Sequence, residues 1–295
     1  MTSTSGLVVR GLRKTYGAHV AVDDVSFALA PGSSLGIVGE SGSGKTTTVR
    51  MLVGLERSDA GTVTLDGRDR SAGTRRAGLR RAERLARARE IQMVFQDPYL
   101  SLDPRITVGG CVDEVLRLHF RLGPAAREAR VAELLDQVGL GPREAAALPR
   151  ALSGGQRQRV AIARALAAEP RVLVLDEAVA ALDVSIQAQI LELLAGIRRD
   201  AGVGYLFVTH DLGVVRHITE EVVVLRHGRI VESGPTGRVL DAPDHPYTRL
   251  LLDSVPRRGW DPARIAEARA AVGGQGGSSG PGRRQDPGQT ARVTR

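Results

Sequence analysis

Hydrophobic and polar residues alternate along the chain with two periods, one typical of strands and one typical of helices. Short apolar runs separated by turn residues occupy positions 7–38 and predict several strands. Three later stretches are mostly apolar and predict buried strands, at positions 91–95, 171–177 and 204–210. Between about 107 and 167, apolar residues recur at helical spacing. Strands and helices in this mixture predict an α/β fold.

Shorter segments add four further elements. Helical spacing recurs over 45–55 and 185–202. Apolar runs on both sides of His227-Gly228 predict a hairpin that turns at this dipeptide. A short helix is predicted for 245–255. The residues after Pro256 are rich in Arg, Gly, Ser and Pro, and this composition predicts a disordered tail over 257–295.

The composition is that of a globular protein. The 295 residues suffice for a large core, and 42% of them are hydrophobic. No apolar run approaches the roughly 18 residues of a membrane helix, and the first residues lack the pattern of a signal peptide. The single cysteine, Cys111, excludes an internal disulfide and a cysteine-rich zinc site, and it is typical of a reducing cytosol.

The net charge of +8 suggests nucleic acid as a partner, but its distribution argues against one. Residues 67–90 hold nine Arg and three acidic residues, and residues 257–295 hold eight Arg and three acidic residues. The rest of the chain is net negative, and aromatic residues make up only 3%. Over 68–89 we expect a loop and an amphipathic helix whose arginines face solvent, and no nucleic-acid groove.

The sequence GESGSGKT at 39–46 fits the phosphate-binding loop pattern G-x-x-x-x-G-K-[ST] at every fixed position. It follows an apolar strand and opens a helix, so its backbone N–H groups and the helix dipole can hold phosphate oxygens. Lys45 can reach the β- and γ-phosphates, and Thr46 can hold Mg²⁺. The predicted nucleotide-binding residues of this loop are Gly39, Glu40, Ser41, Gly42, Ser43, Gly44, Lys45, Thr46 and Thr47.

Polar residues end three of the predicted strands. Asp176 is placed to hold Mg²⁺, and Glu177 could polarise a water for attack on the γ-phosphate. His210 could contact the γ-phosphate and that water, and Gln96 could sense both Mg²⁺ and the water. The structural alternatives are a helix-capping acidic pair at 176–177 and a capping histidine at 210.

A second glycine-rich stretch, LSGGQRQR at 152–159, opens another predicted helix. Its Ser153, Gly154, Gly155 and Gln156 can present N–H groups, a hydroxyl and a helix dipole to a phosphate without any side-chain charge. One chain thus carries two phosphate-binding patterns more than a hundred residues apart.

The motifs GESGSGKTT, VFQDP, LSGGQRQRVAIARAL, VLVLDE, ALD and VTHD, in this order, resemble the ATP-binding subunit of an ABC transporter over about 7–256. The resemblance implies a RecA-like P-loop core with an N-terminal antiparallel β-subdomain and an inserted helical subdomain. The implied domain is 1–256. Its parts are a catalytic core at about 1–96 and 168–233, a helical subdomain at about 97–167 and a C-terminal extension at 234–256.

In this family two ATPase domains face each other head to tail, and the resemblance therefore implies that the second phosphate site serves the partner's ATP. Tyr16 matches the residue that stacks on adenine, with a packed strand tyrosine as the alternative. Gln96 matches the hinge-loop glutamine, Asp183 the loop that crosses to the other subunit, and His210 the switch histidine. Ala178 and Ala180 depart from the usual Pro and Ser, which puts communication between the subunits in question.

FQDPYLSLDPR (95–105) and APDHPYTRLLLDSVP (242–256) resemble the dipeptide, oligopeptide and nickel importer branch. This implies a peripheral protein on the cytoplasmic face of the membrane, which powers uptake of short peptides or a similar solute. Its implied partners are two transmembrane permease subunits, a second ATPase subunit, identical or different, and indirectly a solute-binding protein. Since Cys111 is the only cysteine, we expect no iron–sulfur centre. An exporter subunit, or an ABC ATPase acting on nucleic acid, remains the alternative.

Overall fold

The central sheet has six strands in the order β10-β9-β3-β8-β7-β6 in the computed structural model, which describes residues 5–71, 81–97 and 101–254. Neighbours from β9 to β6 run parallel, and β10 pairs antiparallel with β9. The carboxyl ends of the parallel strands therefore meet at one edge of the sheet. The strands are β3 (Ser34–Val38), β6 (Ile91–Val94), β7 (Val172–Asp176), β8 (Gly204–Thr209), β9 (Glu221–Arg226) and β10 (Arg229–Pro235).

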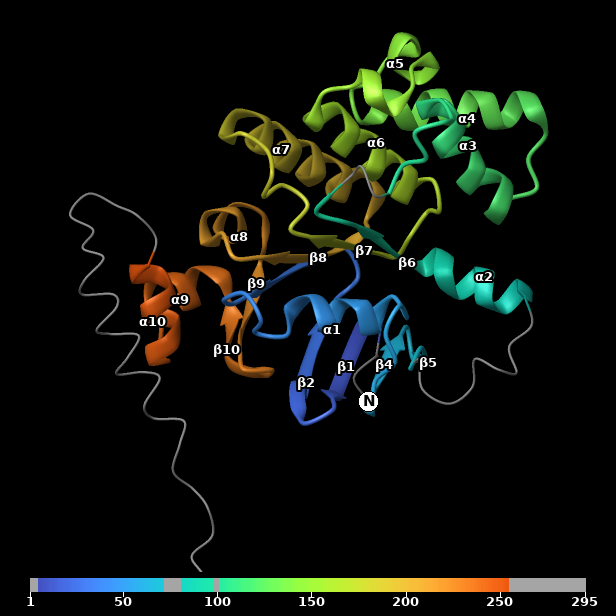
Figure 1. Ribbon diagram of the computed structural model, residues 1–295. Helices are drawn as coiled ribbons and strands as arrows, with labels where there is room; N and C mark the ends of the chain where they lie inside the picture. The colour runs from blue at the N-terminus through green and yellow to red at the C-terminus, as the bar shows by residue number, and fades with distance from the viewer. Residues whose placement is uncertain (1–4, 72–80, 98–100, 255–295) are drawn as a thin grey trace, which may run out of the picture. The chain divides into compact units, whose positions relative to one another are not determined.

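A second, antiparallel sheet follows the order β2-β1-β4-β5. Its strands are β1 (Leu7–Tyr16), β2 (His19–Leu29), β4 (Ala60–Leu65) and β5 (Arg68–Asp69). Helix α1 (Lys45–Leu52) joins the hydrophobic core between the two sheets, where Val49 packs with residues such as Val9 of β1 and Ile37 of β3. Figure 1 shows α1 beside β1 and β2, on the side of the central sheet away from most other helices.

Four α-helices lie in the part of the β6–β7 connection that the structure describes, as the helical spacing predicts. They are α3 (Val108–His119), α4 (Pro124–Gln137), α5 (Pro142–Ala146) and α6 (Gly154–Leu166). They build a second core with α7 (Val184–Ala201) on the other face of the sheet (Figure 1). The remaining helices are α2 (Arg81–Glu90), α8 (Leu212–Ile218), α9 (Thr236–Asp241) and α10 (Pro246–Asp253).

The central strands are mostly apolar because they contribute side chains to both hydrophobic cores. Val172 and Val174 of β7 point into the core between the sheets, whereas Leu173 and Leu175 point into the helical core. Successive side chains of a strand lie on opposite faces, so a strand covered on both faces needs apolar residues at every position. The predicted α/β fold with an antiparallel subdomain and an inserted group of helices is thereby confirmed.

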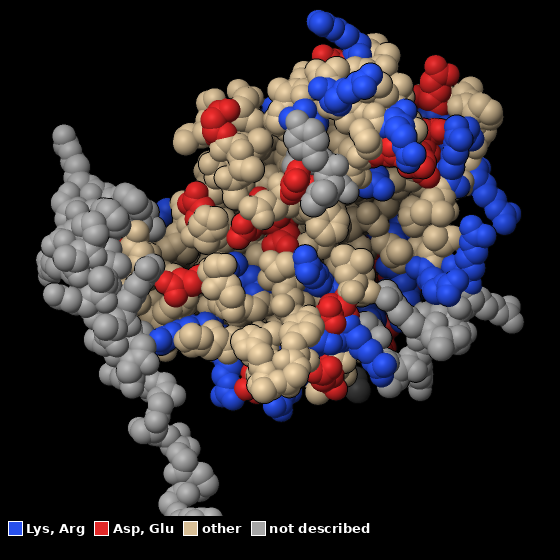
Figure 2. All heavy atoms as spheres, in the orientation of Figure 1, with Lys and Arg blue, Asp and Glu red and all other residues tan. Residues whose placement is uncertain are grey.

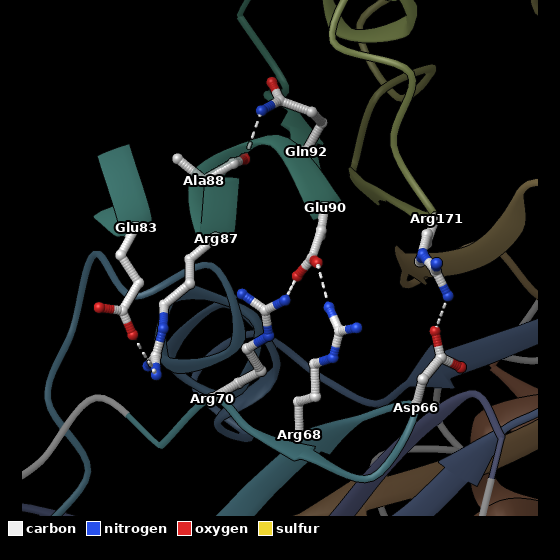
Figure 3. A network of polar contacts seen from close by, with 9 residues as sticks. All are labelled: Asp66, Arg68, Arg70, Glu83, Arg87, Ala88, Glu90, Gln92 and Arg171. Carbon is white, nitrogen blue, oxygen red and sulfur yellow. Dashed lines mark hydrogen bonds and ion pairs between the residues drawn. The ribbon is translucent and has the colours of Figure 1, made fainter. Parts of the chain in front are cut away.

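Three arginines of the arginine-rich segment pair with acidic residues of the same segment (Figure 3). Arg68 and Arg70 both pair with Glu90, at the end of α2, and Arg87 pairs with Glu83 within that helix. Likewise, Arg171 pairs with Asp66. In Figure 2, basic side chains gather where α2 lies, and acidic side chains lie among basic ones over other parts of this face. Helix α2 has no buried residue among those described, which fits the expected solvent-facing arginines, but the Arg70 side chain is only 7% exposed and departs from that expectation.

Two predictions extend beyond what the structure covers. The tail predicted for 257–295 lies outside the described residues, as do positions 72–80 of the predicted Arg-rich loop. The subdomain boundaries at 96, 167, 233 and 256 stay predictions. Over 5–71, 81–97 and 101–254, every helix is too short or too polar to cross a membrane.

Candidate functional site

The loop between β3 and α1 has a backbone that only glycine adopts readily at three positions. Gly39, Gly42 and Gly44 have φ angles of 153°, 79° and 102°. A Cβ atom on Gly39 would lie 2.2 Å from the carbonyl oxygen of Leu225, and one on Gly44 would lie 2.4 Å from that of Ala21. The glycines therefore supply both the curvature of the loop and its close approach to neighbouring backbone.

Lys45, the first residue of α1, folds its side chain back over this loop. Its ammonium donates hydrogen bonds to the carbonyl oxygens of Gly39 at 2.8 Å and Glu40 at 2.9 Å. The residue is only 5% exposed. Burial lowers the pKa of Lys45, while the carboxylates of Glu177, Asp176 and Glu40 act in the opposite direction. A buried ammonium inside a ring of backbone groups suits a triphosphate, whose charge would offset the burial.

Asp176, the last residue of β7, reaches the start of α1. The Thr46 hydroxyl lies 3.4 Å from a carboxylate oxygen of Asp176. Burial, followed by the charge of Glu177, raises the pKa of Asp176 above its ordinary value. A hydroxyl and a carboxylate are hard oxygen ligands of the kind that Mg²⁺ prefers, and a cation there would stabilise the buried charge. The donor set thus fits the metal role predicted for Thr46 and Asp176.

Glu177 and His210 meet at the ends of β7 and β8. The Nδ1 atom of His210 lies 3.4 Å from a carboxylate oxygen of Glu177. Glu177 has a φ angle of 49°, and its N–H donates to the carbonyl oxygen of Val208 at 2.8 Å. Glu177 is thus in the left-handed region just beyond β7. Its side chain therefore does not continue the alternation between the two faces of the strand.

The second glycine-rich stretch forms the N-terminus of α6. Ser153 is the N-cap, and Ser153 and Gln156 exchange two hydrogen bonds in a capping box. Gly155 packs so closely on α7 that a Cβ atom would lie 2.5 Å from a methyl carbon of Ile186. The N–H groups of Gly154 and Gly155 in the first turn keep the orientation that suits an anion. The first turn of α6 is therefore packed against Ile186 of α7. The P-loop, in contrast, lies against the backbone of Ala21 and Leu225.

The remaining predicted site residues differ in their surroundings. Tyr16 ends β1 and is 47% exposed, with the Lys14 ammonium 5.0 Å from its ring centroid. Gln96 is exposed two residues after β6. The carboxylate of Asp183 caps α7 by accepting from the N–H of Ile186 and the hydroxyl of Ser185, at 2.9 and 2.8 Å. Exposure of Tyr16 suits stacking better than the packed alternative, while Asp183 has a structural role as a helix cap.

Sequence reasoning missed two residues that touch these loops. Tyr247 of α10 accepts a hydrogen bond from the N–H of Glu40, and its only sequence signal was the HPYT stretch, which as bare physics predicts a helix start. Arg157 of α6 is buried, and its guanidinium donates to the carbonyl oxygen of Leu152, at the start of the second glycine-rich stretch. In a sequence with so many arginines, nothing marked the one at position 157 as buried.

The loop, the Thr46–Asp176 pair and the Glu177–His210 pair gather at the carboxyl edge of a parallel sheet, and this arrangement is that of the P-loop NTPase fold. Residues 22–180 match the family model described as ABC transporter. The chain belongs to the ABC transporter family. Residues 231–274 match a second model, "Oligopeptide/dipeptide transporter, C-terminal region", which extends past Pro256 into the predicted tail.

Curated relatives and solved structures agree with this assignment. The glutathione import ATP-binding protein GsiA of Escherichia coli (strain K12) is 50% identical over 252 residues, which are 85% of this chain and 39% of the relative. The protein of that name from Pectobacterium atrosepticum is 48% identical over 260 residues, or 88% of this chain and 40% of the relative. The chain therefore spans about two fifths of the length of these relatives.

Among solved structures, the ATP-binding cassette MJ0796 in a dimeric post-hydrolysis state with ADP and Pi has a TM-score of 0.68 and 30% identity. The match covers 78% of this chain and 98% of that one. The cbiO1 protein of Clostridium perfringens, part of a transporter complex, has a TM-score of 0.72 and 26% identity, with 86% and 97% covered.

Proposed function

We propose that this chain binds and hydrolyses ATP with Mg²⁺ and thereby powers uptake of short peptides or a similar small solute through separate membrane subunits. The observation that carries the proposal is the presence of both glycine-rich sites and the C-terminal oligopeptide/dipeptide region in one chain. The relatives' names specify glutathione import, which favours uptake over the exporter alternative. Arg68, Arg70 and Arg87 pair with Glu90 and Glu83 of the same segment, which weighs against a nucleic-acid role for these three arginines.

Each predicted site residue has a distinct role in this proposal. Lys45 and the loop N–H groups hold the phosphates, and Tyr16 stacks on the adenine. Thr46 and Asp176, with Gln96, hold Mg²⁺, which neutralises phosphate charge when bound. Glu177 orients the attacking water and accepts its proton, and His210 steadies the Glu177 carboxylate across the 3.4 Å contact.

The signature residues 153–156 bind the nucleotide held by a second ATPase subunit. The two subunits close head to tail on two ATP molecules, and loss of the γ-phosphate weakens the interface. The partner ATPase is a second copy or a different chain, and Asp183 lies in the loop that faces it. Closure moves the helices of about 97–167 and, with them, the two permease subunits at the cytoplasmic face of the membrane. A solute-binding protein delivers the solute from outside.

The proposal is tested by isolating the chain from detergent-solubilised membranes of its own host. We expect two multi-span subunits and an ATPase partner to co-purify, and a solute-binding protein to accompany them. The membrane subunits that co-purify can then be reconstituted in vesicles. If they export solute and need no binding protein for transport, uptake is contradicted. Ribosomes or nucleic acid without any membrane subunit would contradict transport altogether.

A further inference from the structure

The C-terminal helix α10 touches the ATP-binding loop directly. Tyr247, in its first turn, is only 2% exposed, and its hydroxyl oxygen accepts a hydrogen bond of 3.0 Å from the backbone N–H of Glu40. The two residues are 207 positions apart in the sequence. A side chain of the C-terminal region thus holds the second residue of the phosphate-binding loop.

The peptide group that Tyr247 holds is also the one that binds Lys45. The N–H of Glu40 and the carbonyl of Gly39 belong to one planar unit. The carbonyl oxygen of Gly39 accepts from the Lys45 ammonium at 2.8 Å, and the N–H of Glu40 donates to the Tyr247 hydroxyl. Hydrogen bonds at both ends of a peptide polarise each other, so the tyrosine hydroxyl both orients this plane and strengthens its hold on the ammonium.

The residues before Tyr247 fix its position. The carboxylate of Glu232, on β10, accepts from the N–H groups of Asp244 at 2.8 Å and His245 at 3.1 Å. Burial acts to raise the pKa of Glu232, but the Thr248 side chain, these two N–H groups and the charge of His245 together outweigh burial, so its pKa lies below the ordinary value. The Nδ1 atom of His245 then accepts from the N–H of Tyr247 at 3.1 Å, and Pro246 begins the helix.

The adjacent strand leaves this loop little freedom. The guanidinium of Arg226, at the end of β9, lies 4.9 Å from the centroid of the Tyr247 ring. The carbonyl oxygen of the preceding Leu225 lies where a Cβ atom of Gly39 would be. The Gly39–Glu40 peptide is therefore enclosed by β9 on one side and by α10 on another.

We propose that Tyr247 is a positioning residue for ATP binding, through which the C-terminal region sets the geometry of the phosphate-binding loop. The inference rests on the proposed ATPase function and adds a role for the HPYT stretch. Without the hydroxyl, the N–H of Glu40 loses this acceptor and the Gly39–Glu40 peptide is held less firmly in its orientation. Lys45 is then held in place less firmly, while Glu177 and His210 keep their contact.

The test is Tyr247→Phe in the full chain, since phenylalanine keeps the ring against Arg226 and removes only the hydroxyl. We expect KM and Kd for ATP to rise about three- to ten-fold, the range of one neutral hydrogen bond, with kcat nearly unchanged. Amide hydrogen exchange at Glu40, measured on the labelled chain, should accelerate. Unchanged ATP affinity together with unchanged exchange at Glu40 would overturn the inference.

Tyr205→Phe provides a matched control. The Tyr205 hydroxyl is also buried, but it lies in the helical core on β8 and has no hydrogen-bond partner among the described residues. We expect this variant to keep the wild-type KM. An equal rise in KM in both variants would mean that loss of any buried hydroxyl has this effect, which would overturn the role of Tyr247.

Failure of the inference can be distinguished from failure of the proposed function. Lys45→Ala should lose ATP binding whether or not Tyr247 positions the loop. If Lys45→Ala binds ATP normally, the assignment of the nucleotide site to this loop is wrong. If Lys45→Ala loses binding while Tyr247→Phe changes neither ATP affinity nor Glu40 exchange, only the inference fails.

Discussion

At the scale of single residues, the conformation of Glu177 determines what its carboxylate can do. This residue lies just beyond β7 with a φ angle of 49°, where non-glycine residues are uncommon. Its hydrogen bond to the backbone of Val208 holds it there, next to the strand that carries His210. The result is a half-buried carboxylate in contact with an exposed imidazole. Backbone strain at such a position is typical of functional sites.

Glu177→Gln should therefore separate ATP binding from hydrolysis. The amide cannot accept a proton from water, so we expect kcat to fall at least about 100-fold, as for loss of a general base. ATP affinity should stay near the wild-type value, because Lys45 and the loop N–H groups are untouched. Steady-state hydrolysis and equilibrium ATP binding measure the two effects. Wild-type turnover in this variant would contradict the role assigned to Glu177.

Asp176 illustrates a conflict between function and stability. Burial and the neighbouring Glu177 raise its pKa in the folded protein, so ionisation is easier in the unfolded chain. A raised pKa stabilises the fold below the unfolded pKa of about 3.9, and this stabilisation is lost as the pH rises through the folded pKa. At neutral pH the ionised carboxylate therefore destabilises the protein when no metal is bound.

Asp176→Asn should raise the melting temperature of the metal-free protein at pH 7 while it weakens Mg²⁺-dependent hydrolysis. The gain in melting temperature should shrink as the pH falls toward about 4, because the wild-type carboxyl then becomes neutral as well. Thermal unfolding across this pH range measures the effect. A lower melting temperature at pH 7 in the variant would show that the hydrogen bond with Thr46 outweighs the burial of charge.

At the scale of elements, the start of α6 depends on α7. Ser153 and Gln156 cap α6, and the absence of a side chain on Gly155 lets α7 approach closely. Helix α7 is in turn capped by Asp183, three residues before Ile186. The signature turn thus owes its shape to an adjoining helix as well as to its own residues.

Gly155→Ala should force α6 and α7 apart, because the new Cβ atom would lie 2.5 Å from a methyl carbon of Ile186. We expect overpacking to cost about 1–3 kcal/mol of unfolding free energy. Ile186→Ala removes that methyl, so the double variant should be less destabilised than the two single changes together predict. Urea unfolding of the four proteins measures the coupling, and strict additivity would contradict a direct clash.

At the scale of the whole molecule, the distribution of charge argues against a nucleic-acid partner. The arginines at 68, 70, 87 and 171 are paired with acidic side chains (Figure 3). Each pair reduces the local charge that would otherwise attract a phosphate backbone. Residues 257–295 hold eight Arg and three acidic residues, so a large part of the net charge of +8 lies outside the described surface.

The chain should consequently show no salt-sensitive mobility shift with duplex DNA at physiological ionic strength. Phosphate-backbone binding weakens steeply with salt, so a titration from low to physiological salt distinguishes it from other association. Binding that persists at physiological salt, with a steep salt dependence, would instead support an ABC ATPase acting on nucleic acid.

The sequence by itself determined the local features of this protein. The spacing of apolar residues predicted the strands and helices, because periodicity depends only on neighbouring positions. GESGSGKT predicted the loop, since its glycines and lysine act within eight residues. The resemblance to ABC ATPases supplied the roles of Tyr16, Asp183 and residues 153–156, which stay predictions.

Only the tertiary structure decided how distant segments meet. The contact between Glu177 and His210, the packing of Gly155 on Ile186, and the hydrogen bond from Glu40 to Tyr247 all join residues that are far apart in sequence. Such contacts depend on strand order and on how helices pack over the sheet, which no local pattern specifies. For the same reason HPYT predicted only a helix start, whereas the folded chain places its tyrosine against the ATP-binding loop.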